Sequence, residues 1–104
     1  FQEGEKKIRV ESILYIESKL HKLEFHILEH GLATYTMYGT LNEVENELEE
    51  YHFLRIHQSF LVNLKYIKCV TGYKVVLSNG QELTVPRARY KTVKDTFIAY
   101  KGEL

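Results

Sequence analysis

Four basic side chains gather near the carboxyl end of the chain, at Arg87, Arg89, Lys91 and Lys94, and Asp95 is the only acid close to them. An arginine guanidinium is planar and can donate two parallel hydrogen bonds to O6 and N7 of a guanine. Neighbouring cations contact phosphates, although a lone surface arginine more often forms a salt bridge. The basic neighbours of Arg87 therefore favour a base contact, with Arg89 and Lys91 as candidates for the adjacent backbone.

Two earlier groups of polar side chains could also reach a nucleic acid. His21 lies between Lys19 and Lys22, so it should be exposed, and a neutral imidazole can donate to or accept from a base edge. On residue type alone, a plain loop histidine is the preferred interpretation. Gln58 can bond a base through both amide atoms or simply hold a loop. Ser59 is more consistent with a helix cap than with a base contact, and the N–H end of that helix could hold a phosphate.

The histidines and the single cysteine argue against a metal centre or an enzyme. The five histidines form no H-x-x-x-H pair on a plausible helix, and Cys69 has no second cysteine for a disulfide or a zinc site. Glycine-rich phosphate loops, G-x-S-x-G motifs and convincing carboxylate pairs are missing too. We interpret His57 as structural, and we expect no metal, no cofactor and no catalysis. A lone cysteine favours a reducing compartment, which predicts a cytoplasmic protein.

The net charge of zero conceals a strong asymmetry. Residues 1–50 carry 11 acidic and 5 basic side chains, a balance of −6, whereas residues 51–104 carry 3 acidic and 9 basic ones, a balance of +6. Such a split favours a polyanion or an acidic partner for the positive half. Two solvated faces that happen to sort by sequence half are an equally good account of the charges alone.

The first third of the chain is expected to be β. Lys7–Val10 and Ile13–Ile16 are short apolar segments, while Leu23–Leu28 partly alternates and Leu32–Tyr38 is rich in strand-favouring types. His30-Gly31 between the last two indicates a hairpin turn.

A short acidic helix should follow, over Thr40–Glu50. Thr40 and Glu43 fit a capping box, in which the carboxylate reaches back to the cap N–H. Leu41, Val44 and Leu48 fall on one face. Because the glutamates of this helix would repel phosphates, we expect it to point away from any nucleic acid.

The remaining segments are predicted mostly as strands. Phe53–His57, Tyr66–Val70 and Tyr73–Leu77 are strand candidates, and Ser59–Asn63 is taken as one helical turn capped by Ser59. Ser78–Gln81 is predicted to form a type I′ turn.

In that turn, Asn79-Gly80 would supply the positive φ values that join the preceding strand to Glu82–Val85. Pro86 ends this strand. From Arg87 onward an amphipathic helix is expected, and its apolar positions are Tyr90, Val93, Phe97 and Tyr100. The chain is thus predicted as one domain over residues 1–104, mainly β with short helices and a C-terminal helix, and without a membrane span.

Several local phrases resemble the LytTR family of DNA-binding domains. They are Ile13-Leu14-Tyr15-Ile16-Glu17-Ser18 followed by His21-Lys22, the long phrase from Phe53 to Asn63, and Asn79-Gly80 before Val85-Pro86-Arg87. The resemblance runs from about Ile8 to about Tyr100. One departure is Pro86, where relatives often have a serine; proline still sets φ for a helix start.

This resemblance implies an elongated, mostly antiparallel β fold that binds double-stranded DNA through loops rather than through a recognition helix. Carried over by position, the base-contacting residues are His21 and Arg87, in successive major grooves, with Gln58 facing the DNA between them. The family also implies the output domain of a bacterial response regulator, a receiver domain in the full-length protein, and a homodimer on repeated operator elements. The alternative is a non-catalytic β module that binds an acidic protein or single-stranded RNA through its basic half, which would require exposed aromatic side chains beside the basic patch.

Overall fold

The computed structural model describes residues 2–3 and 6–102. Five of its strands form an antiparallel sheet in the order β5-β4-β3-β7-β6. The strands β3 (Ile13–Lys19), β4 (Lys22–Leu28) and β5 (Leu32–Tyr38) form a meander, and the hairpin of β6 (Phe53–His57) and β7 (Phe60–Asn63) joins it through β7. The strand β4 was predicted from partial alternation of apolar residues and β5 from its strand-favouring residue types, and both are confirmed together with the His30-Gly31 turn between them.

One face of this sheet is covered by helix α1 (Leu41–Glu47). The buried positions Leu41, Val44 and Leu48 pack with the inward-facing side chains of β3, β4 and β7. The Thr40 side chain caps the helix by accepting from the N–H of Glu43 at 3.3 Å, as predicted. The carboxylate of Glu43 accepts from the Thr40 hydroxyl at 2.9 Å rather than from the cap N–H.

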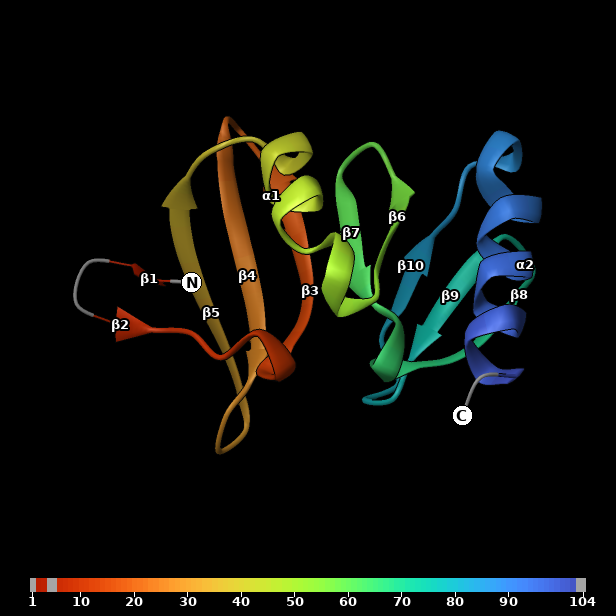
Figure 1. The fold of residues 1–104 in the computed structure, drawn as a ribbon, viewed down its shortest axis with the longest axis horizontal. Helices are drawn as coiled ribbons and strands as arrows, with labels where there is room; N and C mark the ends of the chain where they lie inside the picture. The colour runs from red at the N-terminus through yellow and green to blue at the C-terminus, as the bar shows by residue number, and fades with distance from the viewer. Residues whose placement is uncertain (1, 4–5, 103–104) are drawn as a thin grey trace.

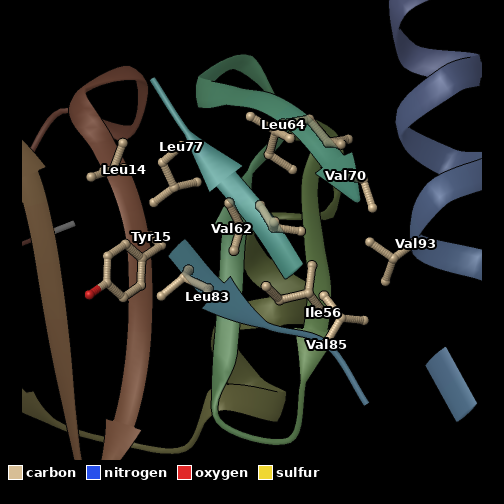
Figure 2. Close-up of a cluster of buried hydrophobic side chains, with 12 residues drawn as sticks. Leu14, Tyr15, Ile56, Val62, Leu64, Val70, Leu77, Leu83, Val85 and Val93 are labelled. Atoms are coloured by element: carbon tan, nitrogen blue, oxygen red, sulfur yellow. The ribbon is translucent and has the colours of Figure 1, made fainter. Parts of the chain in front are cut away.

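The opposite face is covered by a three-stranded sheet and the C-terminal helix. The strands β8 (Ile67–Thr71), β9 (Lys74–Leu77) and β10 (Glu82–Thr84) are antiparallel in the order β10-β9-β8, and α2 spans Arg87–Gly102. Figure 2 shows the resulting core, in which side chains of β3, β6 and β7 meet those of the small sheet and Val93 of α2. The predicted helix face is confirmed, because Val93 is buried and the three aromatic positions pack against the same core.

The strand β3 serves both cores. All four residues of Ile13–Ile16 are buried, which no simple alternation would give. The register with β4 shifts between Ile13 and Tyr15, so the strand carries a bulge. Ile13 and Ile16 consequently face the α1 side, while Leu14 and Tyr15 face the small sheet.

Short elements complete the chain. The strands β1 (Gln2–Glu3) and β2 (Lys6–Lys7) pair with each other. The 3₁₀ helices lie at Val10–Ser12, Glu49–Tyr51 and Leu64–Tyr66. The molecule is elongated, with principal extents of 38 × 27 × 24 Å. Among residues 2–3 and 6–102, no helix is both long enough and apolar enough to cross a lipid bilayer.

The helical turn predicted at Ser59–Asn63 is wrong, because Phe60–Asn63 is the strand β7. Leu61 and Val62 are both fully buried, and they face the two different cores. A strand presents successive side chains to opposite faces, so this position between β3 and β6 requires β structure. Ser59 therefore caps no helix.

The type I′ turn predicted at Asn79-Gly80 is also wrong, although the β9–β10 hairpin itself is present. Gly80 has φ 89°, whereas the φ of Asn79 is not positive. The N–H of Gly80 bonds the carbonyl of Leu77, and the N–H of Leu77 bonds the carbonyl of Gln81. This is the pattern of a three-residue hairpin loop that ends in a glycine bulge.

Candidate nucleic-acid interface

Three segments that carry the predicted site residues lie along one edge of the molecule. In Figure 1 this is the upper edge, where the β3–β4 turn, the β6–β7 turn and the first residue of α2 are all found. His21 and Gln58 line one groove of about 460 Å³, together with Leu20, Ser59 and the first residues of α1. Arg55 also lines this groove and a second one that contains Arg89. The two grooves thus connect the β3–β4 turn to the start of α2.

The β3–β4 turn is a two-residue loop between the paired residues Lys19 and Lys22. Its residues Leu20 and His21 have φ values of 52° and 66°, which are the positive values that a type I′ turn requires. His21 and both lysines are exposed. The ammonium of Lys22 lies 5.4 Å from the ring of Tyr38. The turn therefore projects a histidine between two cations, as the sequence predicted.

The β6–β7 turn is fixed in place by Arg55. The guanidinium of Arg55 donates to the carbonyl of His57 at 2.9 Å and to the carbonyl of Gln58. It also donates to Asn42 and Glu45 of α1, at 2.8 Å each. The side chain of Arg55 is only 12% exposed, so one partly buried cation joins the turn to the helix.

Both backbone polar groups of Ser59, in the same turn, are bonded within the protein. The N–H of Ser59 donates to Nδ1 of His57 at 3.0 Å, and its carbonyl accepts from the N–H of Ser18 at 2.9 Å. His57 thus has the structural role predicted for it. The idea that Ser59 starts a helix whose N–H end holds phosphate is wrong. Gln58 is exposed, and no described group bonds its side-chain amide.

The start of α2 presents Arg87 and Arg89, and both are exposed. The guanidinium of Arg87 lies 5.3 Å from the ring centre of Tyr73, which itself contacts Tyr90 at 4.6 Å. This stacking limits the directions in which the arginine can extend. Lys91 donates to Asp95 at 2.8 Å, and this hydrogen bond raises the pKa of Lys91.

The acidic helix α1 is closer to this edge than its charge predicted. Thr40, Leu41 and Asn42 line the groove of His21 and Gln58, and Glu45 and Glu49 line the groove of Arg89. The first residues of the helix therefore lie beside His21 and Gln58 and not on a separate face, and the orientation of the helix relative to a nucleic acid stays a prediction. Glu45 is needed there because it neutralises the partly buried Arg55.

A family model described as the LytTr DNA-binding domain matches residues 4–98. The chain belongs to the LytTR family. This LytTR domain is 29% identical over 92 residues to the sensory transduction protein LytT of Bacillus subtilis, a match that covers 84% of the chain and 37% of that protein. It is 31% identical over 96 residues to the transcriptional regulatory protein LytR of Staphylococcus aureus, covering 76% of the chain and 39% of that protein.

A solved structure gives the same family. The LytTr DNA-binding domain of a response regulator from Bacillus cereus superposes with a TM-score of 0.72 at 26% identity, covering 88% of this LytTR domain and 84% of that chain. The mainly β fold with antiparallel sheets and a C-terminal helix is thereby confirmed. The chain spans less than half the length of the two named regulators.

Three residues at this edge of the LytTR domain escaped the sequence analysis. Arg55 was counted only as a positive charge, because its four acceptors come from two segments that no local pattern brings together. Leu20 carries no local signal that would single it out in the sequence. Tyr73 was assigned to a strand, but it lies in the β8–β9 turn with φ 58°. Tyr73 and Arg87 can both be read from the sequence, but only the folded chain shows that the arginine stacks on the tyrosine ring.

One cluster in the described residues has side chains of the metal-binding type. Ligand atoms of Glu17, Glu24 and His26 lie within 4.8 Å of one another. Glu17 and Glu24 are direct cross-strand partners, and like charges in that position repel. Nε2 of His26 lies 3.7 Å and 3.9 Å from the two carboxylates, and no hydrogen-bond partner reaches it. The ring is 15% exposed and stacks on Tyr15 at 4.2 Å.

The LytTR domain should lose stability in mild acid because of His26. Burial lowers the pKa of His26, and the attraction of Glu24 and Glu17 only partly offsets it. The unfolded chain therefore takes up this proton first as the pH falls below about 6.5, so the contribution is complete above that pH and declines below it. Urea unfolding at about pH 7.5 and about pH 5.5 should show a smaller difference for His26→Gln than for the wild type. His30→Gln, in the exposed β4–β5 turn, keeps His26 and should retain the wild-type difference. Equal pH dependence in all three proteins would contradict the prediction.

Replacing Arg55 should destabilise the domain far more than replacing a surface arginine. Arg55→Met removes every charge-assisted bond between the β6–β7 turn and α1, so we expect a loss of about 1–3 kcal/mol in the free energy of unfolding. Arg9→Met is the matched control, since Arg9 is 77% exposed and pairs with Glu11 at 3.2 Å; it should change stability by less than about 0.5 kcal/mol. Urea unfolding compares the two. Equal losses would mean that the buried network contributes no more than a surface pair.

Proposed function

We propose that this chain is the sequence-specific, double-stranded-DNA-binding domain of a bacterial transcription regulator. The observation that carries the proposal is the common edge formed by the β3–β4 turn, the β6–β7 turn and the start of α2 (Figure 1). The β3–β4 turn and the start of α2 are separated along the long dimension of the molecule, which measures 38 Å in all, and the β6–β7 turn lies between them (Figure 1). We assign the two outer segments to successive major grooves, which are about one helical turn apart, about 34 Å, and the β6–β7 turn to the DNA between them.

The chemistry of the exposed side chains separates the proposed base contacts from the proposed phosphate contacts. Arg87 is suited to a guanine, His21 to a base edge, and Gln58 to a base or a bridging water. These three side chains have no described hydrogen-bond partner inside the protein, so their donors and acceptors are available. We assign the phosphate contacts to the exposed cations around them, Lys19, Lys22, Arg89 and Lys91. Ser59 keeps only its hydroxyl for a phosphate, because its backbone is bonded internally.

The larger assembly is also part of the proposal. We treat residues 1–104 as one DNA-binding domain of a longer cytoplasmic protein that carries a receiver domain, in agreement with the extra length of the named relatives. Two copies would bind repeated elements, because one small module buries only about 600–1,000 Å² of its surface on DNA. Linking two copies raises the effective concentration of the second without any new base contact.

One observation favours the alternative of a module that binds single-stranded nucleic acid. Tyr38 and Tyr73 are exposed aromatic residues, and each lies next to a cation of the proposed face. Bases can stack on such rings. The two tyrosines, however, lie at the β5 edge and in the β8–β9 turn, toward opposite ends of the long axis in Figure 1. This separation favours a duplex over a continuous stacking platform.

A selection experiment tests the proposed function. The domain is incubated with a random duplex library at moderate salt, and bound sequences are recovered and read. We expect enrichment of a short motif, and stronger retention of duplexes in which the motif occurs twice at a fixed spacing. The selected duplex is then placed in competition with each of its single strands and with polyglutamate. Failure to enrich any motif, or more effective competition by a single strand or by the acidic polymer, would reject the proposal in favour of the alternative.

A further inference from the structure

We propose that Leu20 is a specificity-determining residue, which packs on the C5 methyl group of a thymine in the major groove entered by His21. The inference rests on the proposed function, since it assigns one more contact to the same DNA-facing edge. It differs from the assignments above because it involves an apolar side chain and an apolar feature of the base.

The exposure of Leu20 is the first observation. Leu20 is 84% exposed, the highest value among the large hydrophobic residues in the described part of the chain. A single exposed leucine is common on protein surfaces and needs no explanation by itself. The high exposed fraction nevertheless shows that Leu20 contributes almost no packing to the fold. Neither hydrophobic core therefore requires a leucine at this position.

The backbone of Leu20 is the second observation, and it is independent of the first. Its φ of 52° lies in the left-handed region, where a bulky side chain is an outlier and costs about 1–3 kcal/mol. Asparagine, aspartate and glycine are the residues preferred in such turns. A leucine here is therefore unfavourable both for the turn and for solvation, and neither effect is offset by contacts within the protein.

The position of Leu20 tells which partner it meets. It lies at the tip of the hairpin, directly before His21 and between the paired cations Lys19 and Lys22. It also lines the groove that contains Gln58. A tip carried into the major groove by its neighbours would bring Leu20 to the base edges. The thymine methyl is the apolar group displayed there, so it is the feature that a leucine can recognise.

The experiment removes each side of the proposed contact in turn, first the thymine methyl group and then the side chain of Leu20. Each thymine of the selected duplex is replaced in turn by deoxyuridine, which deletes only the C5 methyl. Wild-type affinity should fall about fourfold at one position, the effect expected for returning one buried methyl to water. For Leu20→Asn the same replacement should have no effect, because asparagine cannot make the apolar contact. Leu32→Asn is the matched control: Leu32 is 56% exposed and starts β5 beside the β4–β5 turn, away from the groove, so its response should equal that of the wild type.

The stability of the variant is the second measurement. Since asparagine tolerates positive φ, Leu20→Asn should unfold at the same or a higher temperature than the wild type. A lower unfolding temperature would show that Leu20 has a structural role and would overturn the inference. So would a Leu20→Asn protein that still responds to the methyl, or a wild type that responds to none.

A uniform loss of affinity in Leu20→Asn, equal on thymine and deoxyuridine duplexes, would also overturn it, and would indicate a wedge between base pairs. Failure to bind any duplex would instead count against the proposed function. The two failures are therefore distinguishable.

Discussion

Binding to a cognate duplex should weaken about 150- to 500-fold when the salt concentration rises from about 50 to about 200 mM, because cations on the protein release counterions from phosphates. Four exposed cations are assigned to phosphates, Lys19, Lys22, Arg89 and Lys91, and Arg87 brings a fifth cation to the same edge against a guanine. Neutralisation of about four to five phosphate charges gives a slope of log affinity against log salt of about −4. Titrations at several salt concentrations measure it directly, and a flat response would make an electrostatic DNA interface untenable.

Single substitutions locate this effect on the surface. Lys22→Gln, at the β3–β4 turn, should reduce the magnitude of the slope by about 0.9. Lys65→Gln is the control, because Lys65 is also exposed but lies in the 3₁₀ helix Leu64–Tyr66, at the lower edge of the molecule, opposite the edge that carries the turn (Figure 1). Its slope should remain that of the wild type. If both variants changed the slope equally, binding would depend on total charge and not on this edge.

Arg87→Ala should lower affinity for the cognate duplex by about 5- to 150-fold, which corresponds to the loss of one bidentate contact to guanine, about 1–3 kcal/mol. The loss should be confined to duplexes that carry the preferred base at one position. Lys91→Ala should instead weaken binding to all duplexes about equally, as expected of a phosphate contact. The effect of Lys91 should also be smaller, because its ammonium is already bonded to Asp95.

Competition between duplexes that differ at single base pairs separates these outcomes. An Arg87→Ala protein with unchanged base preference would reduce Arg87 to a backbone contact. Tyr73→Leu gives a further check, since it leaves Arg87 in place and removes the ring beneath it. This variant should lose part of the same base preference. Full retention would show that the stacking does not orient the arginine.

Elements with a strong period were predictable from sequence. β4 and α2 each bury one face, so apolar residues recur at the strand or helix spacing. β7 was missed because it is buried on both faces and has only four residues, which leaves no alternation to detect. Ser59 before it then resembled a helix cap.

The position of the type I′ turn was predicted wrongly for a different reason. Local chemistry favoured a type I′ turn at Asn79-Gly80, yet positive φ at both central residues occurs at Leu20-His21. The length and pairing of β3 and β4 leave two residues to close that hairpin, so tertiary structure overrides residue preference. His21 and Arg87 could be nominated by resemblance and by charge. Arg55 could not, because its role depends on acceptors in a helix and a turn that only the folded chain brings together.

The sharing of β3 and β7 between the two cores has a consequence for the spacing of the proposed DNA contacts. β3 carries the His21 turn directly, and the small sheet that leads into α2 packs on the same two strands. Neither half can lose its packing without exposing the other, so the domain should unfold in one cooperative transition. The separation between the β3–β4 turn and the start of α2 is then set by a rigid body and not by a flexible linker. With the two segments in successive grooves as proposed, the domain should bind poorly when the number of base pairs between its two outer contact points is changed.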